Sequence, residues 1–137
     1  MKQIYIQKKQ NQLLTLSDME HETILGQPVA KANHYEVGKG ADGSARIIKS
    51  QALCNYEKTF MRQCRIYKDR LIDGRFKLHI VVYYSNTQCD LDNSLKTVLD
   101  CLQQVKAIKN DNLCVAIDTT KRIDRVNPRV EFTIEEI

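Results

Sequence analysis

Four aspartates and a lysine between positions 90 and 111 are the side chains best suited to chemistry. Asp90 and Asp92 lie two positions apart after an apolar run, so in an extended segment both point to the same side. If a helix begins near Asp92, its turn of about 100° per residue places Lys96 and Asp100 within roughly 80° of Asp92. This polar stripe borders the apolar stripe of the same helix. The pattern therefore predicts a charged cleft where a strand meets a helix.

The remaining aspartate, Asp111, follows that helix after a turn at residues 107–110. We expect the turn to return the chain toward the same end of the sheet, which brings Asp90, Asp92 and Asp111 together. Carboxylates a few ångströms apart stay ionised only when a cation neutralises them. Hard oxygen ligands of this kind suit Mg²⁺ or Mn²⁺, which activates a bound water and stabilises charge on a phosphodiester. Lys96 is then placed to bind the scissile phosphate.

Each of these residues also has a simpler interpretation. Asp92 serves equally well as a helix N-cap, and Lys96 with Asp100 as an ion pair one turn apart. Residues 110–112, Asn-Asp-Asn, are typical of a turn in which side chains bond to nearby backbone groups. We favour a functional site because all of these residues surround one strand-to-helix junction.

Hydrophobic periodicity predicts the elements that position the site. A β-branched and aromatic run at 76–84 predicts a central strand. Apolar residues spaced three or four apart predict helices at 50–71, with Ser50 as N-cap, and at 92–105. Four further strands are expected, at 22–27, 46–49, 115–123 and 129–134, the last two joined as a hairpin. This order predicts one α+β (mixed α/β) domain, with a mixed β-sheet of about four or five strands packed with two main helices.

Two segments lie outside this pattern. Residues 1–20 are polar and Gln-rich, which predicts an N-terminal extension or arm before a folded domain at 21–137. Residues 31–49 hold three glycines and four basic residues, which predicts a flexible loop that closes in a short strand. Such a loop is suited to clamping DNA, although plain solvated loops are the commoner case.

Composition sets the class of protein. A length of 137 residues, with 42% hydrophobic and 28% charged residues, predicts a single globular unit, and the net charge of +4 is compatible with a nucleic-acid partner. The five cysteines include no C-x-x-C pair, which indicates reduced, mostly buried thiols in a cytoplasmic protein. No zinc-ligand spacing, organic-cofactor motif, membrane span or signal sequence is expected.

The central motif resembles a known family. The pattern D-L-D-N-x-x-K-x-x-x-D, followed by an acidic turn nineteen residues after its second Asp, is similar to that of RusA-type Holliday-junction resolvases. Here it comprises Asp90, Asp92, Asn93, Lys96 and Asp100, with Asp111 in the final turn. The resemblance extends from about residue 23 to residue 134 and includes an early Asn/Tyr-containing loop at 31–35.

That resemblance implies a homodimeric endonuclease that binds four-way DNA junctions and makes paired symmetric nicks with Mg²⁺ or Mn²⁺. It implies metal ligands at Asp90, Asp92 and Asp111, a catalytic lysine at Lys96, and supporting roles for Asn93 and Asp100. A twofold-symmetric dimer also suits a junction with two equivalent scissile positions. The chain departs from the pattern at Asn110, where many relatives are acidic, and at Cys89, where relatives often have a basic residue or proline.

Phosphate contacts are expected from polar and basic side chains outside the motif. The candidates are Lys31, Asn33, Tyr35, Lys39, Arg46, Lys49, Lys121, Arg122 and Arg125. Two alternatives stay open. One is a junction-binding or branched-DNA-binding protein without turnover, and the other is a phosphatase or sugar transferase that uses an Asp-x-Asp motif.

Overall fold

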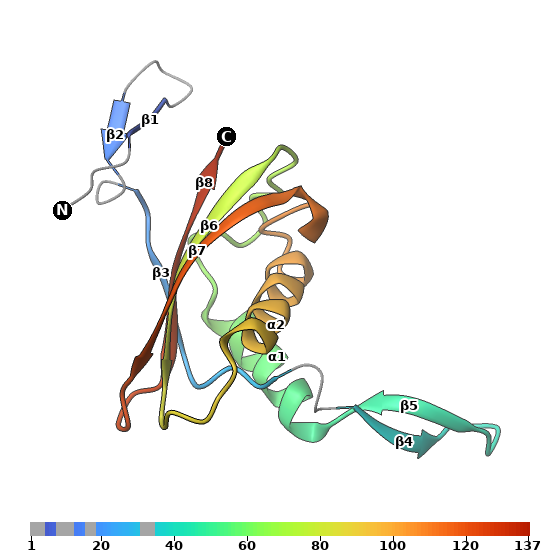
Figure 1. Ribbon diagram of the computed structural model, residues 1–137. Helices are drawn as coiled ribbons and strands as arrows, with labels where there is room; N and C mark the ends of the chain where they lie inside the picture. Colours follow the sequence, from blue (N-terminus) through green and yellow to red (C-terminus); the bar gives the residue numbers. More distant parts are fainter. Residues whose placement is uncertain (1–4, 8–12, 16–18, 31–34) are drawn as a thin grey trace.

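The computed structural model describes residues 5–7, 13–15, 19–30 and 35–137. Within them, a four-stranded sheet with the order β3-β8-β6-β7 carries two helices on one face (Figure 1). The central strands are β6 (Phe76–Tyr84) and β8 (Arg129–Glu136), and the edges are β3 (Glu22–Leu25) and β7 (Cys114–Ile123). Because β6 is parallel to β7 and antiparallel to β8, the sheet is mixed. The predicted fold class is confirmed.

The core lies between the sheet and the two helices, α1 (Gln51–Gln63) and α2 (Leu91–Gln104). Inward-facing residues of β6 and β8, among them Leu78, Val82 and Phe132, are fully buried there. Alternation along these strands sends polar side chains to the opposite face, where His79 Nε2 lies 2.6 Å from Glu135 Oε2. The buried apolar core therefore lies on the side of the sheet that the helices cover.

The expected hairpin of the last two strands is wrong. β7 and β8 are consecutive in sequence, but each pairs with β6 and not with the other. The reason is the α2 crossover, which lays β7 parallel to β6 on one side, while β8 pairs on the other. As a result β7 is an edge strand, exposed along most of its length.

The segment at 35–49 is a β-hairpin, not a loop with one short strand. β4 (Tyr35–Lys39) pairs with β5 (Ala45–Lys49), and the hairpin projects from the body beside α1 (Figure 1). The missed strand β4 has few apolar residues and lies next to a glycine-rich turn, where Gly43 has a φ of 83°. At the N-terminus, β1 (Tyr5–Gln7) and β2 (Leu13–Thr15) form a separate two-stranded sheet within the expected extension.

Helix α1 begins as predicted but ends earlier. Ser50 Oγ accepts a hydrogen bond from the backbone N–H of Leu53, which confirms the N-cap. The helix ends at Gln63, and the buried carboxylate of Glu22 binds the turn that follows. Its Oε1 accepts hydrogen bonds from the backbone N–H groups of Arg65 (2.9 Å) and Ile66 (2.8 Å), which stabilises the non-helical turn. The thiol of Cys64 also donates to Glu22, and burial raises the pKa of that thiol to about 12.

The cysteines are all free. Cys64 and Cys101 are buried, and Cys54, Cys89 and Cys114 are half-buried, so the thiols are less completely buried than expected. No helix of the described residues combines the length and apolarity needed to cross a bilayer.

Replacing Glu22 tests how α1 is held on the sheet. We expect Glu22→Ala to lower the free energy of unfolding by about 3 kcal/mol, because several buried backbone N–H groups lose their acceptor. Glu22→Gln, which keeps an acceptor oxygen, is expected to cost less. Urea denaturation measures both. The control is Glu20→Ala: Glu20 forms an exposed ion pair with Arg70, so this change is expected to cost less than about 1 kcal/mol. Equal losses for Glu22→Ala and Glu20→Ala would contradict the role of Glu22.

Candidate metal and DNA site

The first two aspartates lie where the sequence placed them, at the junction between β6 and α2. Asp90 is the N-cap residue of α2, and Asp92 is in its first turn. Both are exposed. The Asp90 carboxylate makes no capping hydrogen bond, so the N-cap position does not use its side chain. Two exposed carboxylates thus lie at the positive end of a helix.

The side chains of Tyr84 and Ser94 fix the position of this helix start. The Tyr84 hydroxyl donates to Ser94 Oγ at 2.7 Å, and Ser94 Oγ in turn donates to the carbonyl of Asp90 at 3.2 Å. Tyr84 is fully buried, and burial raises its pKa, so it stays a neutral donor. The end of the central strand is therefore bonded directly to the residue that begins α2.

The loop between Tyr84 and Asp90 is held from two further elements. Gln27 Oε1 accepts from both the backbone N–H and the hydroxyl of Ser85, at 2.8 and 2.9 Å. The ammonium of Lys121, on β7, donates to the carbonyls of Thr87 (2.9 Å) and Cys89 (2.6 Å). These contacts keep the approach to Asp90 in one conformation.

Gln27, Tyr84 and Ser94 were not among the sequence candidates. Their contribution depends on pairings across the fold, such as Gln27 with a serine 58 positions away. Ser94 and Tyr84 carried a weaker local signal, because a buried tyrosine or serine needs a hydrogen-bond partner.

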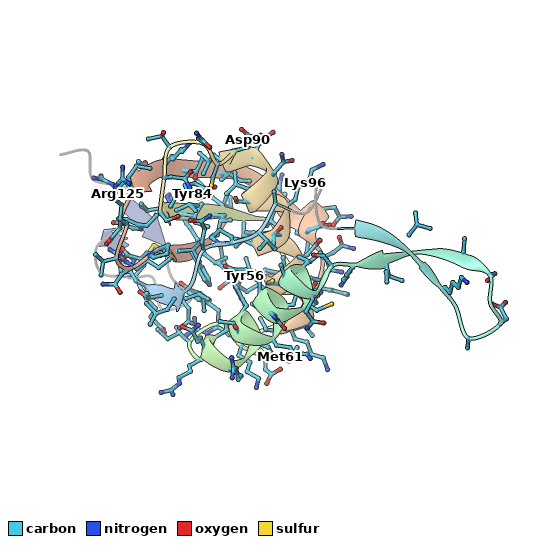
Figure 2. The ribbon with its side chains drawn as sticks, turned by 90° about the horizontal axis from the view of Figure 1, so that it is seen from below. Tyr56, Met61, Tyr84, Asp90, Lys96 and Arg125 are labelled. Atoms are coloured by element: carbon cyan, nitrogen blue, oxygen red, sulfur yellow. The ribbon has the colours of Figure 1, made fainter. Side chains whose placement is uncertain are left out.

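The other expected site residues on α2 lie at different distances from its start: Asn93 and Lys96 are in the first two turns, and Asp100 is about 13 Å along the helix from Leu91. Lys96 is exposed one turn after Asp92, on the side of the molecule from which the β4–β5 hairpin leaves (Figure 2). Asn93 and Asp100 are half-buried on α2. The geometry thus keeps Lys96 accessible to a ligand at the junction.

The expected convergence of Asp111 within one chain is wrong. Asp111 follows α2 at the opposite end from Asp90, and its backbone N–H donates to Gln103 Oε1 at 3.1 Å. At about 1.5 Å per residue, Gln103 lies roughly 18 Å along the helix from Leu91. Consistently, the described residues contain no group of three or more His, Cys, Asp or Glu side chains arranged to hold a metal.

The physical reason is the direction of the crossover. Strands β6 and β7 are parallel, so the helix between them must carry the chain back to the start of the sheet before β7 can begin. The exit from α2 is then fixed on the segment before β6: Leu71 N–H donates to Lys106 O, and Ile72 N–H donates to Ala107 O. Asn110 Oδ1 accepts from the backbone N–H of Asn112, which is the local turn that the simpler interpretation predicted.

The expected DNA-contacting residues fall into three groups. Lys31 and Asn33 lie outside the described residues, and Tyr35 and Arg46 are described only by their backbone positions on the hairpin. Lys39 is exposed on the hairpin, and Lys49, at its base, pairs with Glu57 of α1. On the sheet, Arg122 and Arg125 are exposed, whereas the Lys121 ammonium contacts the loop carbonyls.

Comparison with known proteins agrees with the motif. The family model described as "Endodeoxyribonuclease RusA" matches residues 26–135. A curated relative from Aquifex aeolicus (strain VF5), "Crossover junction endodeoxyribonuclease RusA", is 32% identical over 114 residues, which cover 80% of this chain and 87% of that protein.

These matches show that the chain is a nuclease of a family that uses a divalent metal cofactor. The match across most of the chain shows that it belongs to the RusA family of endodeoxyribonucleases. The phosphatase and sugar-transferase alternatives are thereby set aside.

Proposed function

We propose that this chain resolves four-way DNA junctions by paired symmetric nicks, with Mg²⁺ or Mn²⁺ held by Asp90 and Asp92. The observation that supports the proposal is the pair of exposed carboxylates at the start of α2, whose backbone Ser94 holds by a hydrogen bond. Asp90 is the N-cap residue, but its carboxylate makes no capping hydrogen bond. The relative's printed name supports a crossover junction as the substrate. Because the family acts on DNA and the thiols are free, we also propose a cytoplasmic location.

The residues of this chain have distinct roles in the proposed reaction. Asp90 and Asp92 supply oxygen ligands, and Mg²⁺ at such a site accepts waters and phosphate oxygens in its remaining positions. The bound ion supplies an acidified water and neutralises charge on the phosphate. Lys96 binds a non-bridging oxygen of the scissile phosphate and stabilises the charge that develops there. Asn93 and Asp100 support this arrangement from α2, and the hairpin residues with Arg122 and Arg125 contact flanking phosphates.

Two carboxylates in one chain leave the predicted three-aspartate set incomplete. We propose that Asp111 of the partner subunit completes it in a homodimer. The edge strand β7 offers the surface for pairing. No strand of the described residues lies beside its outer backbone groups, and Val115, Ile117 and Ile123 are 52%, 39% and 40% exposed. A ten-residue edge of this kind is a template for pairing with another strand.

The direction of such pairing decides which residues meet. In a twofold-symmetric dimer, two β7 strands pair antiparallel, so the start of one lies beside the end of the other. Asp111 immediately precedes the start of β7, and the end of β7 reaches the loop before Asp90 through Lys121. The same pairing therefore brings Asp111 of each subunit toward Asp90 and Asp92 of the other. The dimer would hold two equivalent sites, one at each end of the paired strands.

Replacing one metal ligand tests the reaction. We expect Asp92→Asn to lower the rate of junction cleavage more than about a hundredfold, because a charged ligand is lost with little change in shape. Junction binding is expected to persist. The measurement is cleavage of a labelled four-way junction and of a matching duplex, with Mg²⁺, Mn²⁺ or chelator. The control is Asp73→Asn, which changes an exposed aspartate on another turn. Binding without cleavage by the wild-type protein under every cation would instead support the non-catalytic alternative.

Introducing a charge on β7 tests the dimer. We expect Ile117→Asp to give a monomer that has lost cleavage, because pairing through β7 would bury an unpaired carboxylate from each subunit. Leu71→Asp is the matched control, because Leu71 is also an exposed apolar residue but lies far from β7 in the sequence. Its backbone has a positive φ, which Asp tolerates. Light scattering gives the mass of each variant, and circular dichroism checks its fold. A dimeric, active Ile117→Asp protein would contradict pairing through β7.

A further inference from the structure

The outer face of α1 forms an open groove of about 910 Å³ that the proposed cleavage site does not use. It lies on the side of the molecule opposite Asp90, as the positions of Met61 and Asp90 in Figure 2 show. The lining residues are almost all polar or basic: Asn55, Lys58, Thr59, Met61, Arg62, Cys64, Arg65 and Lys68. The groove is therefore a second candidate site, built on one helix and the turn that follows it.

The groove concentrates positive charge. Lys58, Arg62 and Arg65 recur four and three positions apart, so they share one face of the chain as it leaves α1, and Lys68 extends the row. All four are exposed, and within the described part of the chain no ion pair joins any of them to a carboxylate.

The carboxylates near α1 are engaged on its inner side. Glu57 binds the ammonium of Lys49 and accepts from Gln104 Nε2, and the buried Glu22 accepts the backbone N–H groups after the helix. Four cations thus face solvent together, and no carboxylate of the described residues forms an ion pair with them. An arrangement of this kind attracts a polyanion.

We propose that this groove binds the sugar–phosphate backbone of a junction arm, away from the cut. The proposal rests on the proposed function, because only a branched substrate sends further arms past the outer faces of the dimer. Lys58 and Arg62 lie about 6 Å apart along α1, which is close to two steps of about 3.4 Å per nucleotide along a DNA strand, and Arg65 and Lys68 continue the lining beyond the end of the helix. Asn55 and Thr59 add side-chain donors for phosphate oxygens.

The lining favours nucleic acid over other anionic partners. Met61 is the one large exposed apolar side chain that α1 contributes among the described residues. A protein interface of comparable size normally contains aromatic anchors, and a helix that binds a bilayer needs an apolar face. Neither feature is present on this face of α1, whereas phosphate binding requires only the cations and donors that are there.

The test removes the row of charges and compares long arms with short ones. The variant Lys58→Gln/Arg62→Gln/Arg65→Gln is matched by a control that also loses three positive charges, Arg70→Gln/Lys77→Gln/Arg75→Gln, outside the groove. Fluorescence anisotropy without catalytic metal measures binding to junctions with arms of about three helical turns or of about one turn, roughly 10 base pairs. The salt dependence of binding is recorded for each, and the cleavage rate is measured on fully bound junctions.

On long arms, we expect the groove variant to bind at least tenfold more weakly than the control, with a salt slope smaller by about 2 to 3. On short arms the two should bind alike, and the cleavage rate of bound junctions should be unchanged. Equal affinities on long arms, or an equal loss on short arms, would overturn the groove proposal while leaving the proposed function intact. A wild-type protein that neither binds nor cuts branched DNA would overturn both.

Discussion

The parallel pairing of β6 with β7 is the constraint on which the rest of the structure depends. A parallel pair requires a crossover, and the crossover here is α2, whose start carries Asp90 and Asp92 and whose exit carries Asp111. The same pairing makes β7 an edge strand. The parallel pairing therefore separates Asp111 from Asp90 and Asp92 within one chain. It also exposes β7, the strand through which we propose that a second chain pairs.

Buried polar contacts stabilise the start of α2. The bonds among Tyr84, Ser94 and Asp90 lie in the core, where such a network is rigid when every member has a partner. Lys121 and Gln27 then fix the preceding loop from β7 and from the segment after β3. These contacts fix the backbone at and before Asp90, which limits the rearrangement that the proposed metal site would need.

The sequence predicted the elements well because their hydrophobic patterns are strong. The bounds of β6 agree with the run at 76–84, and Ser50 caps α1 as its position indicated. Contacts between segments that are distant in the sequence were harder to predict. The α1 stripe continued past the helix into Tyr67, which is buried as expected but lies in a turn captured by Glu22. No local pattern reveals such a long-range contact.

The same limit explains the errors at the site. Local spacing correctly placed Asp90 and Asp92 at the junction between β6 and α2. The extended segment expected across both residues ends at Asp90, because α2 begins at Leu91 and Asp92 lies in its first turn. The expectation that Asp111 joins these two aspartates rests on the turn at 107–110 returning the chain to the same end of the sheet, but this turn leaves Asp111 at the far end of α2. Where each acid lies depends on the pairing of β7 with β6, which only the three-dimensional structure provides.

The most direct test of this account is complementation between two inactive variants, Asp92→Asn and Asp111→Asn. If each site combines Asp92 of one subunit with Asp111 of the other, a mixed dimer contains one doubly altered site and one intact site. After the variants are unfolded and refolded together, random pairing should restore about a quarter of the wild-type sites, seen as single nicks in a labelled junction. If each chain built its own site, every site in the mixed dimer would carry one substitution. Failure of the mixture to nick, with mixed dimers present, would contradict the shared site.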